Sequence, residues 1–335
     1  MHDPALARTA ASVLASLVIA CGSSGHDDDG PGTDGPGSAA SFDPDGSSGQ
    51  TSTDGGATTT GAGTTTTVGA SESSSGGADS GTGEGSTTGV EWVPYFFDDF
   101  EGYGDGASLS NFAPFDAAGR TTATTEAAHR GQQSARMAIA AGDGGGFGQW
   151  GGVLAIDPAV ARGGEVWVRL WVRWPSAFEF SASPWMKFLR LHARAADGSN
   201  AGYNDLYVDR ADETTSVLRT IKEIHDVWAV YDGQSLPRDT WERYEMYLFV
   251  DDVPVDDGGD ARVRIWRDDT LIFDRTDVPT ITEEGGVIDY FYLFTYWNDE
   301  MPPDNHCHVD DLVIATDANP PPFQDAAGNA WIGAW

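Results

Sequence analysis

The basic residues of this 335-residue chain are few but concentrated. Fifteen of the nineteen lysines and arginines lie between Arg162 and Arg275, and most of them are arginines. Because a guanidinium group forms two parallel hydrogen bonds with a carboxylate, a cleft lined with these side chains could bind acidic groups of a ligand. The alternative is that the arginines only pair with nearby carboxylates on the protein surface. The sequence leaves both interpretations open.

Two segments place basic side chains on one face of a predicted strand, because residues two apart on a strand point the same way. The segment 166–174 alternates and ends at Pro175, so its Val/Leu face should be buried. Its other face carries Trp167, Arg169, Trp171 and Arg173. The segment 186–194 alternates next, with Phe188, Arg190, His192 and Arg194 on one face.

The rest of the pattern that positions these residues is also made of strands. Further strands are predicted over 206–208, 216–224, 227–231, 241–250, 261–266, 271–273, 289–297 and 309–315, with Asp/Gly-rich turns between several of them. Helical periodicity is confined to one possible turn near 158–162. Many short strands favour an all-β, antiparallel sandwich. Trp331, Ile332 and Trp335 should attach the tail after Pro320 to its surface.

Composition divides the chain into a part that can bury a core and a part that cannot. Residues 21–90 are rich in Ser, Thr, Gly and Asp, and we expect them to form a disordered tether. Residues 91–317 form the predicted sandwich, and 318–335 form the Pro-rich tail. The net charge of −33 excludes nucleic acid and anionic lipid headgroups as favoured partners.

The first 20 residues resemble a bacterial lipoprotein signal. Arg8 precedes a short apolar run, and Ala20 precedes Cys21 in the pattern Leu-Val-Ile-Ala-Cys. The resemblance implies that Cys21 is lipidated, and that the mature protein is exported and anchored in the cell envelope, with Gly22 favouring the outer membrane. The lipid bilayer would then be a partner through Cys21 only. The alternative is ordinary cleavage and free secretion.

Several familiar kinds of site are not expected. His306 and His308 could share one ion at most, and no further ligand cluster is apparent, so a zinc site is not predicted. If Cys21 carries lipid, Cys307 has no partner for an intramolecular disulfide. The Gly-rich stretch 142–152 lacks the Gly-Lys-Ser/Thr of a phosphate loop, and no Gly-x-Ser-x-Gly element suggests a serine hydrolase.

Residues 95–317 resemble the concanavalin A-like jelly-roll superfamily of lectins, glucanases and polysaccharide lyases. The resemblance is carried by Phe97-Asp98-Asp99-Phe100-Glu101-Gly102, Gly131-Gln132-Gln133-Ser134, Arg262 to Asp268 and Val309 to Ile314. It implies a structural calcium ion held by Asp310 and by backbone oxygens near Asp98 and Gly131. The alternative is that Asp310 and Asp311 only cap backbone amides. The carboxylate pattern of retaining glucanases is absent, so glycoside hydrolysis is not expected.

Two strands also resemble those of alginate-type lyases within this superfamily. Arg190-Leu191-His192 is similar to their Gln-Ile-His strand, and Tyr290 to Asn298 is similar to their Tyr-Phe-Lys-Ala-Gly-Val-Tyr-Asn-Gln strand. The resemblance implies that Arg190 pairs with a uronate, that His192 is a base or charge stabiliser, and that Tyr296 is the catalytic acid or base. The family lysine is replaced here by Tyr292. The remaining residues expected to bind ligand are Trp171 and Arg173 on an adjoining strand, Lys187, Tyr292 and Asn298.

These features predict an anchored jelly-roll domain that binds a polysaccharide, which could be acidic, across its concave face. Aromatic rings would stack on sugar faces and arginines would bind acidic groups. The alternative is a lyase that cleaves a uronate polysaccharide by β-elimination. A second alternative is a structural or adhesive surface protein.

Overall fold

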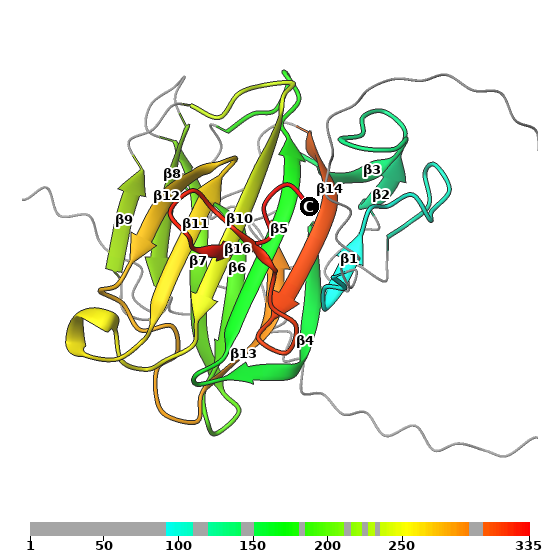
Figure 1. Ribbon diagram of the computed structural model, residues 1–335. Coiled ribbons are helices and arrows are strands. Elements are labelled where there is room, and N and C mark those ends of the chain that lie inside the picture. The colour runs from blue at the N-terminus through cyan, green and yellow to red at the C-terminus, as the bar shows by residue number, and fades with distance from the viewer. Residues whose placement is uncertain are drawn as a thin grey trace, which may run out of the picture. The chain divides into compact units, whose positions relative to one another are not determined.

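The computed structural model describes residues 92–109, 120–141, 151–180, 185–210, 216–222, 227–231, 235–294 and 304–335, which form an antiparallel β-sandwich (Figure 1). The predicted signal peptide and tether, including Cys21, lie outside these residues. The described residues include no helix that is long and apolar enough to cross a membrane. The predicted all-β jelly-roll sandwich is confirmed.

One layer is an eight-stranded sheet with the strand order β12-β11-β10-β5-β14-β3-β2, in which β1 also pairs with β14. Its strands are β1 (Phe96–Asp98), β2 (Thr122–Thr124), β3 (Ser134–Ile139), β5 (Glu165–Arg173), β10 (Trp241–Phe249), β11 (Arg262–Arg267), β12 (Thr270–Arg275) and β14 (Asn305–Thr316). The last long strand therefore lies between segments that come much earlier in the chain.

The other layer is a six-stranded sheet with the order β4-β13-β6-β7-β8-β9. Its strands are β4 (Gly152–Ala161), β6 (Trp185–Arg194), β7 (Asn200–Arg210), β8 (Ser216–Lys222), β9 (Val227–Tyr231) and β13 (Val287–Leu293). A short 3-10 helix, η2 (Val255–Asp257), lies between β10 and β11, and β15 (Phe323–Gln324) pairs with β16 (Ala330–Trp331) in the tail.

Alternating side chains build the core between the two sheets. On β5 the aliphatic residues Val166, Val168, Leu170 and Val172 all lie in the main hydrophobic cluster, as their spacing predicts. Leu189 and Leu191 face them from the other layer and belong to the same cluster. The β11–β12 hairpin turns at Asp268 and Asp269, where Asp268 has a φ of 51° that suits a tight two-residue turn.

The outer face of β5 is covered by the C-terminal tail. A second hydrophobic cluster joins Ile332 to the buried rings of Trp167, Tyr247 and Trp266, with Trp331 and Trp335 packed against it. The prediction that the tail residues attach to the sandwich is therefore confirmed. Figure 1 shows the red tail crossing in front of the sheet near β10 and β5.

Several local expectations are wrong. The region 158–161 belongs to β4, because pairing with β13 keeps its backbone extended, so it contains no helical turn. Phe188 lies in the core and not beside Arg190, because a register shift between Lys187 and Leu189 turns both Phe188 and Leu189 inward. Strands β1 to β4 were not predicted, since three of them are short or irregularly buried.

Candidate functional site

The six-stranded sheet presents a polar and aromatic outer face. On β6, Leu189, Leu191 and Ala193 enter the core, so Arg190, His192 and Arg194 lie on the opposite face. The cross-strand partners of this strand are tyrosines and aspartates: Tyr203 and Tyr290 lie opposite His192, and Asp205 and Tyr292 lie opposite Arg190. We call this surface of β13, β6, β7, β8 and β9 the outer face of the six-stranded sheet.

Arg190 is buried at the centre of this face. Its guanidinium carbon lies 3.6 Å from the centre of the Tyr203 ring, and its Nε donates a hydrogen bond of 2.6 Å to Oδ1 of Asp205. Because both the cation and Asp205 are buried, the ion pair offsets the cost of removing each charge from water. The ring and the carboxylate together fix the plane of the guanidinium group.

His192 is held between two oxygen acceptors. Its Nδ1 lies 2.5 Å from Oδ1 of Asp289, whose other oxygen accepts a hydrogen bond of 2.7 Å from Nε of Arg194. Its Nε2 lies 3.2 Å from Oδ1 of Asn200, an oxygen that also accepts the Gly202 N–H at 2.6 Å. A neutral imidazole carries one N–H, so it can donate to only one of these oxygens at a time, and both ring nitrogens face protein oxygens.

Aromatic rings surround these charged groups. The His192 ring lies 5.1 Å from Tyr203, 6.1 Å from Tyr290 and 5.9 Å from Tyr292, measured between ring centres. Burial raises the pKa of the Tyr292 hydroxyl, with smaller contributions from neighbouring tyrosines and Asp289, so Tyr292 stays protonated. It can donate a proton or a hydrogen bond, but it does not serve as a base at neutral pH.

The same pattern continues across the sheet towards β9. Lys187 lies over the Tyr207 ring at 4.6 Å, and Tyr207 lies 5.8 Å from Trp228. Arg219 of β8 pairs with Asp209 at 2.6 Å and lies 5.8 Å from the Trp228 ring. Cations therefore lie beside aromatic rings at several places on this face, and Arg190 and Arg219 also pair with aspartates.

The predicted site residues are only partly brought together. Lys187, Arg190, His192 and Tyr292 share the outer face of the six-stranded sheet. Tyr296 and Asn298 lie outside the described residues, so their predicted roles stay predictions.

The prediction that Trp171 and Arg173 line an adjoining strand is wrong. Their strand, β5, belongs to the eight-stranded sheet, because the chain crosses from one layer to the other between β5 and β6. Trp171 stacks on His129 with ring centres 3.7 Å apart, and Arg173 donates a 2.8 Å hydrogen bond to Asp239. Neither residue takes part in the face that carries Arg190.

Sequence reasoning missed the partners that position this site. Tyr203, Asp205, Tyr207 and Asp209 occupy every second position of β7, and this period of two could have revealed a polar face there. Asp289 could not have been found in this way, because the pairing of β13 shifts between Ile288 and Tyr290. That irregularity places Asp289 against His192.

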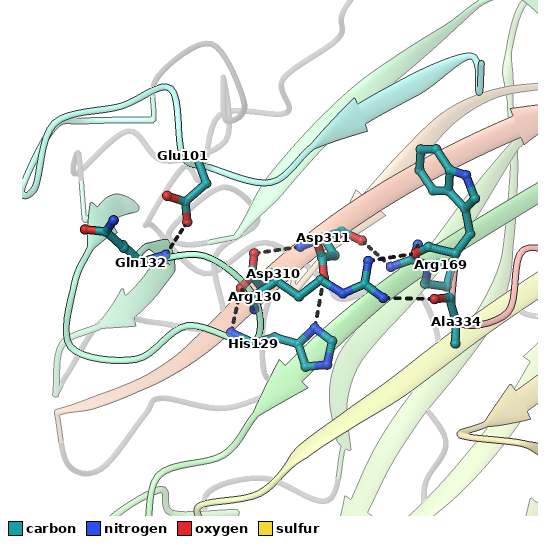
Figure 2. A network of polar contacts seen from close by, with 9 residues as sticks. Glu101, His129, Arg130, Gln132, Arg169, Asp310, Asp311 and Ala334 are labelled. Atoms are coloured by element: carbon teal, nitrogen blue, oxygen red, sulfur yellow. Dashed lines mark hydrogen bonds and ion pairs between the residues drawn. The ribbon is translucent and has the colours of Figure 1, made fainter. Parts of the chain in front are cut away.

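The second acidic centre lies on β14, near the tail. Asp310 accepts backbone N–H groups from His129 at 2.7 Å and Asp311 at 2.8 Å, and His129 Nδ1 lies 2.8 Å from Asp311 (Figure 2). Burial and the charge of Asp311 raise the pKa of Asp310, the N–H donors lower it, and the net result is a pKa of about 7. Figure 2 also shows Arg130 reaching the Ala334 carbonyl, which ties this network to the tail.

The surroundings of Asp310 do not fit the predicted calcium ion. Among the described residues, the groups that contact its carboxylate are the N–H donors of His129, Arg130 and Asp311. Calcium requires six to eight oxygen ligands, and N–H groups present their positive ends where such a cation would lie. The segment after Gly131 likewise turns its N–H groups towards Glu101. The calcium ion stays a prediction.

His306 and His308 lie on the outer face of the eight-stranded sheet. Cys307, which lies between them, and Val309, which follows them, both enter the core. Burial lowers the pKa of His308 to about 4, and it also lowers the pKa of His306, with nearby arginines adding to both effects. Both rings are therefore neutral at pH 7. Cys307 is buried, and no disulfide joins it to another of the residues that the structure describes.

No protein-family model matches the chain, and no curated protein matches it. Among solved structures, the alginate lyase Aly36B matches with 15% identity and a TM-score of 0.49, over 65% of this chain and 95% of that chain. An endo-beta-1,4-glucuronan lyase from the fungus Trichoderma reesei matches with 10% identity and a TM-score of 0.46, over 67% and 95%. An alginate lyase from Aplysia kurodai matches with 10% identity and a TM-score of 0.42, over 59% and 87%.

These likenesses are too weak to transfer an activity, since every identity is below 25% and every TM-score is below 0.5. The chain's own strand order and side chains define an antiparallel jelly-roll domain. Its distinguishing surface is the outer face of the six-stranded sheet, where three cations lie beside aromatic rings.

Proposed function

We propose that the outer face of the six-stranded sheet binds a polysaccharide that carries carboxylate groups. The observation that carries this proposal is the repeated contact of a cation with an aromatic ring on this face, by Arg190 with Tyr203, by Lys187 with Tyr207 and by Arg219 with Trp228. Aromatic faces stack on the apolar faces of sugars, and guanidinium groups bind carboxylates bidentately. A strand face of this kind suits an extended polymer better than a small ligand, which favours a concave pocket.

Different residues of the face take different parts in binding. Arg194 and Arg219 contact the ligand, because their side chains are 40% and 31% exposed. Arg190 and His192 are buried and already paired with Asp205 and Asp289, so they hold the surface in shape from beneath. This division differs from the roles that the lyase resemblance implies for Arg190 and His192.

The alternative is that the same face cleaves a uronate polysaccharide by β-elimination. The protonated Tyr292 close to His192 favours this alternative, because elimination needs an acid for the leaving oxygen. The position of His192 disfavours it, because each ring nitrogen already faces a protein oxygen, whereas a base must reach the C5 proton of the ligand. Binding without cleavage is therefore the better-supported function.

One experiment separates these two functions and a purely structural role. Residues 91–335 are purified and tested against a panel of polyuronates, among them alginate, in 0.15 M salt, which screens the repulsion from the excess of acidic residues in the domain. Retardation in a polysaccharide gel with no rise in the ultraviolet absorbance of an unsaturated product supports the binding module. A rise that is lost in Tyr296→Phe would establish the lyase instead. Neither binding nor product across the panel would leave the structural or adhesive alternative.

We also propose that the domain is exported and held in the cell envelope by lipid on Cys21, as the sequence before it suggests. Metabolic labelling with a radioactive fatty acid tests this proposal. The wild-type protein should be labelled and remain with the membrane fraction, and Cys21→Ser should be unlabelled. Equal labelling of both would contradict the anchor.

A further inference from the structure

We infer that Glu126, His306 and His308 form a binding site for a divalent transition metal ion of the zinc class. The ligand atoms that these three side chains offer all lie within 4.8 Å of one another. The group lies on the eight-stranded sheet and shares no residue with the proposed polysaccharide-binding face. The proposed metal site can therefore be tested independently of the proposed function.

The two histidines are held on a rigid element. They occupy alternate positions of β14, which is hydrogen-bonded to β5 on one side and to β3 on the other. Their rings are perpendicular, with centres 5.4 Å apart. Ligands carried by a central strand keep their separation, which is what a preformed metal site requires.

Glu126 supplies the adjustable ligand. It follows β2 in a turn, where its backbone N–H donates to Oγ1 of Thr124, and its side chain is 59% exposed. Its Oε2 lies 3.9 Å from Nε2 of His308. Ligand atoms around a tetrahedral zinc ion lie about 3.3 Å apart. The Glu126 oxygen therefore has to approach Nε2 of His308 by about 0.6 Å, and the other ligand pairs, which lie within 4.8 Å of one another, have to close by at most about 1.5 Å.

The His308 ring lacks the partner that a buried polar group normally has. The residue is 2% exposed, and its Nδ1 has no hydrogen-bond partner among the residues that the structure describes. Its Nε2 is too far from Glu126 for a hydrogen bond. The nitrogen that faces Glu126 is Nε2, and an ion bound between them would give this nitrogen a partner that it otherwise lacks among the described residues.

The charges around the group favour one class of ion. Arg136 lies 3.5 Å from Glu126, and Arg173 is cross-strand partner to His308, although it is paired with Asp239. The site offers one carboxylate and two imidazoles, and two cations lie nearby. It should therefore bind calcium or magnesium weakly, because these ions depend on several oxygen ligands. Zinc, cobalt, nickel and copper form strong bonds to imidazole nitrogen.

A pocket beside the group leaves room for a fourth ligand. His306 is part of the lining of a cavity of about 380 Å³, together with Arg120, Arg136 and Asn305. A zinc ion with three protein ligands keeps one coordination position for water or for another oxygen donor. Because the cavity is lined by two arginines, a carboxylate-bearing molecule could take that position.

The experiment uses the domain purified without a histidine tag, stripped with a chelator and titrated with Zn²⁺ by calorimetry and with Co²⁺ by visible absorption. We expect one equivalent of zinc to bind, and the cobalt spectrum to show intense tetrahedral bands. Glu126→Gln should weaken zinc binding about tenfold, and His306→Gln should abolish it. Glu284→Gln, on another exposed turn, is the matched control and should bind like the wild type.

Circular dichroism establishes that each variant is folded, and Glu126 is exposed enough that its change should leave the fold intact. The inference is overturned if no saturable equivalent of zinc binds to the wild type. It is equally overturned if folded Glu126→Gln and His306→Gln bind zinc as tightly as the Glu284→Gln control does.

Discussion

The guanidinium carbon of Arg190 lies 3.6 Å from the centre of the Tyr203 ring on the neighbouring strand. This contact joins β6 to β7 at the middle of the outer face, and Asp205 holds the same guanidinium group from the side. A cation that is fixed between a ring and a carboxylate loses little further freedom when a ligand binds over it. The face is therefore organised before any ligand binds.

Gly151, which directly precedes β4, lies so close to neighbouring backbone atoms that no side chain fits there. Its φ is +83°, and a Cβ added there would lie 2.0 Å from the Leu293 carbonyl oxygen. Gly163 has a similar φ of +86° but open space around it. Gly151→Ala should lower the free energy of unfolding by roughly 2–5 kcal/mol, and Gly163→Ala by about 1–2 kcal/mol, because only the first adds a clash to the strained backbone. Urea denaturation of both variants measures the difference, and equal losses would contradict the close approach of β4 to β13.

The C-terminal tail should contribute to the stability of the sandwich. Ile332 is fully buried against Trp167, Tyr247 and Trp266. Ile332→Ala should therefore cost about 2–5 kcal/mol of unfolding free energy. Gln324→Ala, at an exposed position of the same tail, should change it by less than about 0.5 kcal/mol. If both variants unfold at the wild-type urea concentration, the tail is not part of the cooperative unit.

The docking of the tail should also depend on pH through Glu245. Its carboxylate accepts the N–H groups of Ile332 at 2.6 Å and Gly333 at 2.9 Å, and burial raises its pKa to about 7. The native state thus keeps a proton that the unfolded chain, with an ordinary pKa of about 4.3, gives up. The free energy of unfolding should fall as pH rises from about 4.5 to about 7.

Denaturation at a series of pH values tests this dependence. The decrease in unfolding free energy with rising pH should be smaller in Glu245→Gln, because glutamine cannot titrate. It should be unchanged in Glu284→Gln. Because the pKa of Asp310 is raised as well, part of the slope should remain in Glu245→Gln. A Glu245→Gln slope as steep as that of the wild type would show that this carboxyl group does not titrate as the structure implies.

The fold was largely predictable because its longest strands have regular patterns. Strand β5 alternates without interruption, and Pro175 follows it, so its inward face could be assigned from sequence. Strands β1 and β2 have three residues each, which is too few for a period of two to stand out. Their pairing is set by partners far along the chain, such as β14 for β1.

The site was predictable only where it lies within one strand. Arg190 and His192 share a face because they are two residues apart, and the structure confirms that arrangement. Which strand lies next to theirs depends on sheet order, so Trp171 was wrongly placed beside them. The pairing of His192 with Asp289 depends on a register irregularity, which no local pattern reveals.

The measurement that tests the central claim most directly is the affinity of the domain for uronate oligosaccharides, determined by calorimetry for two arginine variants. Arg194→Gln removes an exposed cation from the outer face, and Arg262→Gln removes a comparably exposed one, paired with Asp274, from the other sheet. The proposed function predicts that Kd rises about tenfold in Arg194→Gln and is unchanged in Arg262→Gln. Unchanged binding by Arg194→Gln, or an equal loss in both variants, would contradict binding at this face.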